Sequence, residues 1–186
     1  FGRRAMKISP QDMYDLVVYQ AGAVEAFARA AGSRLHHIKC HGALYNMAAR
    51  DGSLARAIAK AGKDFDARLV LFGLAGSELV RAGHETGLKV ANEVFADRTY
   101  QSDGSLTPRS QPNAVIQDVE TSIVQVKRMV GEGKVRSVQG ADVEVIVDTL
   151  CIHGDEPTAI VVAGAARAAL EKAGVKIVPL PEMPLA

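Results

Sequence analysis

Residues 67–74 read ARLVLFGL, and this stretch decides the fold class of the chain. From Leu69 the apolar side chains follow one another without a polar residue, and Gly73 lies at the end of the run. A half-buried strand alternates apolar and polar residues, whereas an unbroken apolar run of this length is typical of a strand covered on both faces. Such strands belong to parallel sheets with helices packed on them, so the stretch predicts an α/β protein.

Helical and strand-like segments alternate on both sides of this run. Helices are expected from Ser9-Pro10 to Gly32, over 46–61 with a break or new cap at Gly52-Ser53, and over 76–87, 113–131 and 156–173. Further strands are expected over 35–40, 88–95, 143–152 and 175–180. This order predicts one α/β domain over residues 1–186, with a largely parallel sheet that is either doubly wound or closed into a barrel.

Composition excludes several classes of protein. The chain has 186 residues, 48% hydrophobic and 23% charged, with a formal net charge of +1, as in ordinary globular domains. Basic residues do not cluster with aromatic ones, which argues against nucleic-acid binding, and no apolar run is long enough to cross a bilayer. Cys40 and Cys151 form no disulfide framework, so a reducing cytoplasm is the expected location.

Polar residues gather where three predicted strands end. The segments are KCHGALYN at 39–46, NEVFADRTY at 92–100 and DTLCIHGDEP at 148–157. Parallel α/β folds bind ligands where strands end and the following loops begin. His41 and His153 each precede a glycine at equivalent junctions, which favours a catalytic or ligand-binding role for both.

The other polar residues leave alternatives open. Glu93 is either paired with a cation such as Arg98 or available as a base or ligand. Arg98 and Arg109 have the two-pronged geometry that suits a carboxylate or phosphate, although exposed loop arginines are common. Asp155 is expected to cap a helix. A nucleophilic role for Cys40 is not favoured.

Nucleotide-binding motifs are absent from the sequence. GEGKVR, around Lys134, lacks the first glycine and the hydroxyl residue of a Walker loop, and no glycine-rich dinucleotide fingerprint follows a strand. Sequence motifs alone therefore assign no nucleotide site.

Three motifs together resemble the LamB/YcsF (lactam utilisation) family: HIKCHGALYN at 37–46, NEVFADRTYQSDGSLTPRS at 92–110 and TLCIHGDEP at 149–157. Their order and spacing agree with the family, and the similarity extends to FGRRAM at the start. The chain departs from the family's usual residues at Cys40, where proline is typical, and at Thr107, where valine is typical. The resemblance implies a β/α barrel of the glycoside hydrolase/deacetylase type, with seven strands in the intact family.

The resemblance also implies that an N-terminal segment precedes the FGRR stretch in the family. The chain is then expected to form the C-terminal major part of a barrel that is incomplete. Exposed strand edges of such a barrel would promote association of copies.

The function implied by the resemblance is that of the A subunit of ATP-dependent 5-oxoprolinase, which hydrolyses the lactam of 5-oxo-L-proline to L-glutamate. ATP, with Mg²⁺ on the nucleotide, is the expected cofactor, and 5-oxoprolinase subunits B and C are the expected partners. The implied catalytic residues are His41, Glu93, Asp97 and His153, and the implied substrate- or phosphate-binding residues are Asn46, Arg98, Arg109, Gly154 and Asp155.

Two other functions remain open at this point. One is a metal-dependent amidohydrolase or deacetylase that acts alone, with a metal whose identity the residues do not specify. The other is a non-catalytic protein that binds substrate or holds subunits B and C together; the missing nucleotide loop supports it.

Overall fold

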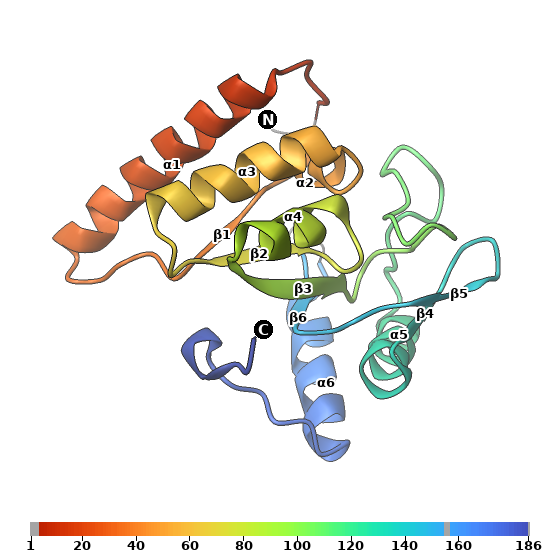
Figure 1. Ribbon diagram of the computed structural model, residues 1–186. Helices are drawn as coiled ribbons and strands as arrows, with labels where there is room; N and C mark the ends of the chain where they lie inside the picture. Colours follow the sequence, from red (N-terminus) through yellow and green to blue (C-terminus); the bar gives the residue numbers. More distant parts are fainter. Residues whose placement is uncertain (1–3, 155–156, 186) are drawn as a thin grey trace. The chain divides into compact units, whose positions relative to one another are not determined.

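The computed structural model describes residues 4–154 and 157–185 (Figure 1). The chain divides into two compact units, Phe1–Asn92 with Pro184–Ala186 and Glu93–Met183. The predicted single domain over residues 1–186 is not tested by this division and stays a prediction.

The first unit is built on a layer of helices. Helix α1 (Pro10–Ala30) lies beside α3 (Gly52–Phe65), and α3 in turn packs on α4 (Glu78–Thr86) (Figure 1). The Ser9 side chain caps α1, as predicted. The predicted break at Gly52-Ser53 is also confirmed, because Asp51 caps α3 and separates it from the short helix α2 (Ala43–Ala48).

Parallel strands supply the sheet. In the first unit β1 (His37–Lys39) pairs with β2 (Val70–Leu74), and His37 lies opposite Val70. The apolar run within ARLVLFGL forms β2, whose residues are buried except for the half-buried Phe72. The strand order is β1-β2-β3-β6, with β3 at Lys89–Phe95 and β6 at Thr149–Cys151. These pairings confirm the predicted α/β class with a parallel sheet.

The second unit contains the end of β3 and its partner β6. Helix α5 (Val119–Glu132) is followed by an antiparallel pair, β4 (Lys134–Arg136) and β5 (Asp142–Glu144) (Figure 1). Helix α6 (Ala159–Lys172) packs on α5. Val126, Met129, Val135 and Tyr100 are fully buried at the centre of this unit.

Two predicted helices begin later than expected. The helix predicted over 113–131 begins at Val119, because the side chain of Asp118 accepts from the Thr121 amide and caps it there. The helix predicted from residue 156 begins at Ala159, with Thr158 at the cap position. The predicted cap, Asp155, lies outside the described residues.

Two predicted strands are also wrong. The strand predicted over 143–152 is two separate strands, since β5 turns back onto β4 while β6 joins the parallel sheet. The strand predicted over 175–180 does not form; residues 175–179 have no regular secondary structure, and a 3₁₀ helix, η1 (Leu180–Glu182), follows them. Pro179 and Pro181 have no amide hydrogen to give to a strand neighbour, which explains the difference.

Several apolar side chains remain on the surface. Phe27 of α1 is 79% exposed and Ile160 of α6 is 87% exposed. Within residues 4–154 and 157–185, no helix has both the length and the apolar character needed to cross a membrane.

Candidate functional site

The register of β3 and β6 brings two predicted site residues together. Phe95 lies opposite Cys151 in the parallel pair, and just beyond it the Ala96 amide donates to the Cys151 carbonyl at 3.1 Å. Asp97 and His153 each follow two residues later on their own chain segments. The strand pairing therefore delivers their side chains to the same point at the carboxyl end of the sheet.

Asp97 and His153 form a tightly held pair. Nδ1 of His153 lies 3.0 and 2.8 Å from the two carboxylate oxygens of Asp97, and the His153 backbone amide donates to Asp97 Oδ2 at 2.8 Å. Asp97 is only 4% exposed, whereas the His153 side chain is 21% exposed. A carboxylate at Nδ1 selects the tautomer that carries its proton there, which leaves Nε2 to exchange a proton with a reactant.

The charge of Asp97 is maintained despite its burial. Burial alone would raise its pKa, but the hydrogen bonds from the His153 side chain and backbone outweigh that effect, so the pKa of Asp97 is lowered. The carboxylate is thus ionised at neutral pH and can stabilise a positive charge on the imidazole. An ionised carboxylate behind a histidine is the arrangement that supports general base catalysis.

Phe95 fixes the plane of the imidazole from a second direction. Its ring stacks on that of His153, with centroids 5.6 Å apart and an angle of 19° between the planes. Phe95 was not among the predicted site residues, because an aromatic residue in an apolar strand does not stand out from core residues. The feature of the sequence that could have identified Phe95 is its position two residues before Asp97.

Glu93 is a buried acid on the same strand. It is 3% exposed and lies opposite Thr149 in the register of β3 and β6. The phenol oxygen of Tyr100 accepts the Phe95 amide at 2.8 Å. The pKa of Tyr100 is raised, mainly because the phenol is buried and to a smaller extent because the charge of Glu93 is nearby. The predicted role of Glu93 as a base or ligand stays a prediction.

The segment after β3 is an ordered loop. Its two limbs pair through bridges between Arg98 and Val115 and between Tyr100 and Leu106. At its tip Asp103 Oδ1 accepts from the Ser105 amide at 2.9 Å, and Gly104 takes a φ of +80° that few other residues tolerate. The loop is therefore a fixed part of the second unit.

The side chain of Arg98 forms hydrogen bonds within this loop. The residue is 4% exposed, and its guanidinium donates to the Ala114 carbonyl at 3.0 Å and to the Thr107 carbonyl at 2.5 Å. These bonds tie the two limbs of the loop together. The prediction that Arg98 binds a phosphate or carboxylate stays a prediction, and its observed contacts give it a structural role.

His41 and Asn46 belong to the first unit. Both are exposed, and the Asn46 amide donates to the Gly42 carbonyl at 3.1 Å. Gly42 has a φ of +65°, which sets the turn between β1 and α2. The neighbouring Cys40 is buried, and burial raises the pKa of its thiol to about 12, which agrees with the expectation that it is not a nucleophile.

The remaining predicted residues lie on exposed backbone or outside the described part. Arg109 and Gly154 are both exposed. Gly154 lies five residues before Ala159, where α6 begins. Asp155 is not among the described residues. Binding roles for these three stay predictions.

The described part of the chain contains no preformed set of metal ligands. Asp97 directs both of its oxygens at His153, and residues 4–154 and 157–185 contain no group of three His, Cys, Asp or Glu side chains placed to hold a metal ion. Mg²⁺ at nucleotide sites takes most of its ligands from phosphates and water. The described residues thus do not fit a metal held by the protein alone.

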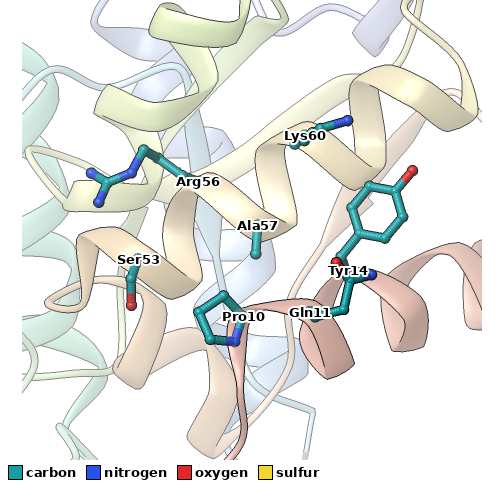
Figure 2. Close-up of a pocket in the computed structure, with 7 residues that line it drawn as sticks. All are labelled: Pro10, Gln11, Tyr14, Ser53, Arg56, Ala57 and Lys60. Carbon is teal, nitrogen blue, oxygen red and sulfur yellow. The ribbon is translucent and has the colours of Figure 1, made fainter.

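An open groove of about 560 Å³ lies in the first unit between the start of α1 and α3 (Figure 2). Lys60 at its edge forms an ion pair with Asp64, which also accepts from the Tyr14 hydroxyl at 2.9 Å. Arg56 extends away from Tyr14 and Lys60 in the close-up (Figure 2). The basic groups of the groove are therefore directed elsewhere, and it lacks the convergent polar groups of a ligand site.

The known proteins that this chain resembles belong to one family. The family model described as the LamB/YcsF family matches residues 1–184. The 5-oxoprolinase A subunit of Bordetella pertussis is 59% identical over 177 residues, which cover 95% of this chain and 70% of that protein. The 5-oxoprolinase A subunit of Tolumonas auensis is 60% identical over 177 residues, with the same shares of the two chains.

A solved structure agrees with these relatives. The lactam utilization protein from Thermus thermophilus matches with a TM-score of 0.84 and 48% identity, covering 95% of this chain and 70% of that one. The family resemblance and the α/β barrel class stated from the sequence are thereby confirmed.

Proposed function

The chain belongs to the LamB/YcsF family, and from that premise we propose that it serves as the A subunit of an ATP-dependent 5-oxoprolinase. The substrate would be 5-oxo-L-proline and the product L-glutamate, with subunits B and C as partners. The names of the relatives support the role as an A subunit. The coupling to ATP and the identity of the partners are part of the proposal.

The observation that carries the proposal is the Asp97–His153 pair. Opening a lactam requires water to attack a carbonyl carbon, and the water must lose a proton as it does so. His153, held through Nδ1 by an ionised carboxylate, has Nε2 as the group that can take that proton. Asp97 then stabilises the imidazolium that forms.

Phosphorylation explains why ATP would be needed. An unstrained lactam is a stable amide; transfer of the γ-phosphoryl group to its carbonyl oxygen releases ADP and makes the carbonyl carbon more electrophilic. Water attacks that carbon, His153 takes its proton, and the ring C–N bond breaks as the nitrogen gains a proton. A second water releases inorganic phosphate from the resulting acyl phosphate and leaves the carboxylate of glutamate.

The other predicted residues have proposed roles that follow their chemistry. Glu93 would be a second base, and His41 would transfer a proton or polarise the carbonyl. Asn46, Arg98, Arg109, Gly154 and Asp155 would bind the substrate carboxylate or the phosphates. Mg²⁺ would arrive on the ATP phosphates, which it would partly neutralise when bound.

Reconstitution tests the proposal. Full-length protein mixed with subunits B and C should form glutamate from 5-oxo-L-proline only when ATP is present. His153→Gln should lower the rate about 100-fold or more, as expected for loss of a general base. His84→Gln is the matched control, because His84 is an exposed residue of α4. Full activity of the His153 variant would remove the catalytic assignment, and activity of subunits B and C alone would remove the role itself.

A further inference from the structure

Four consecutive backbone carbonyls around Asp97 are all hydrogen-bonded. The Gln125 amide nitrogen donates to the Phe95 carbonyl at 3.0 Å and to the Arg98 carbonyl at 2.9 Å. The Ser122 hydroxyl donates to the Ala96 carbonyl at 2.7 Å. The carbonyl of Asp97 itself accepts from the Ile116 amide at 2.9 Å. The turn that presents the Asp97 side chain is thus held at each of its peptide groups.

Three of these four bonds come from one helix. Ser122 and Gln125 are three residues apart on α5 and therefore lie on the same face of it. Ser122 is fully buried, and Gln125 is half-buried. Both side chains are directed at the end of β3.

The helix that supplies these donors is itself fixed. Asp118 caps it by accepting from the Thr121 amide at 2.7 Å. Near its other end Arg128 forms an ion pair with Asp142 of β5 at 2.6 Å, which ties the helix to the β4–β5 hairpin (Figure 1). A helix held at both ends is a rigid support for the groups that it carries.

We infer that Ser122 and Gln125 are positioning residues that hold the turn carrying Asp97 and, through Asp97, the imidazole of His153. The assignment of these two residues to catalysis rests on the proposed function, whereas their effect on the His153 ring does not. Neither residue is placed on the substrate.

The chemistry of the side chains fits this role. A glutamine amide has two N–H donors on one nitrogen, and Gln125 uses that nitrogen for two carbonyls three residues apart. Glutamate at the same place would set carboxylate oxygens against two carbonyl oxygens. Methionine would keep the length of the side chain and remove both donors.

Kinetics of the reconstituted complex give the first readout. Gln125→Met and Gln125→Glu should lower kcat about 10- to 100-fold with little change in KM, because a misplaced proton acceptor slows chemistry more than substrate binding. Ser122→Ala removes one hydroxyl from a closed site and should cause a smaller loss, about 3- to 10-fold. Lys127→Met is the matched control, since Lys127 is exposed on the same helix.

Nitrogen NMR of the histidine rings gives the second readout and needs no substrate. In the full-length protein the neutral His153 ring should show Nδ1 protonated and Nε2 unprotonated, because Nδ1 faces the Asp97 carboxylate. Gln125→Met and Ser122→Ala should mix the two tautomers or shift the Nδ1 resonance, while Lys127→Met should leave both resonances unchanged.

The two readouts separate the inference from the proposed function. Altered His153 resonances in a protein that does not hydrolyse 5-oxo-L-proline would sustain the positioning role and remove the reaction. Unchanged resonances in folded Gln125→Met would overturn the positioning role. If Gln125→Met does not fold, Ser122→Ala decides by the same criterion.

Discussion

The carboxylate of Asp97 accepts hydrogen bonds from two different N–H groups of one residue, His153. The imidazole and the backbone amide of His153 both donate to it, so the ring and the chain segment that carries the ring are fixed together. A substrate-binding carboxylate would direct an oxygen at solvent instead. The contacts of Asp97 thus favour a role behind the histidine.

The lowered pKa of Asp97 has a consequence for stability that depends on pH. Its ionised form stabilises the fold, and this contribution is complete above the ordinary value of 3.8 and is lost as the pH falls through the lower folded value. The difference in unfolding free energy between wild type and Asp97→Asn should therefore not shrink between about pH 7 and about pH 5. Urea unfolding at several pH values checks this, and a difference that already declines by about pH 5 would contradict it.

The thiol of Cys40 is expected to be inert. Its pKa is raised to about 12 by burial, so little thiolate exists near pH 8. In a Cys151→Ser variant, which retains Cys40 as its one thiol, a disulfide reagent should react about 100-fold more slowly with native than with urea-unfolded protein. Equal rates in the two states would show that Cys40 is accessible.

The conformation of a loop or strand depends on which groups hydrogen-bond to its backbone. The loop after β3 has the composition of a surface turn, yet Arg98 within it is buried on two carbonyls. An arginine that closes a loop and one that awaits an anion look alike in sequence. Their contacts distinguish them.

Loss of the Arg98 guanidinium should weaken this loop. Arg98→Met leaves two carbonyls without their charged donor, at a cost on the order of 3 kcal/mol. Chemical unfolding should show that loss, and limited proteolysis should cut within residues 99–117. Arg167→Met is the control, because the Arg167 side chain is 63% exposed and its ion pair with Glu171 is worth less than about 1 kcal/mol. Equal stability of the two variants would remove the structural role of Arg98.

Helix α4 packs closely on the sheet through a glycine. A Cβ at Gly83 would lie 2.5 Å from Val90 Cγ2 and 3.0 Å from Leu71 Cδ2. Gly83→Ala should therefore cost about 1–3 kcal/mol. At Gly164 on α6, an added Cβ would meet no atom within 4 Å. Gly164→Ala should therefore stabilise the folded protein by roughly 0.5–1 kcal/mol. The two unfolding free energies check the prediction, and a neutral Gly83→Ala would contradict the packing.

The sequence predicts the elements whose signals are local. The apolar run of β2, the Ser9 cap of α1 and the new cap before α3 all follow from neighbouring residues. The split between β5 and β6 depends on distant pairing, because β5 finds its partner in β4. The late start of α5 has the same origin, since Val115 pairs with Arg98 before the helix begins.

At the scale of the whole molecule, each compact unit contains part of the predicted site. His41 and Asn46 lie in the first unit, and Glu93, Asp97 and His153 lie in the second. The motifs predicted a site at the second cluster, but the pairing of Asp97 with His153 followed only from the strand register. Phe95, Ser122 and Gln125 were missed because each looks like an ordinary core or helix residue in sequence.

The most direct test of the central claim is the kcat of Asp97→Asn in the reconstituted complex with 5-oxo-L-proline and ATP. Asparagine keeps the shape of the side chain but cannot stabilise a positive imidazole. If the Asp97–His153 pair transfers the proton, kcat should fall on the order of 10²- to 10⁴-fold with KM little changed. A kcat within about twofold of wild type would contradict the account.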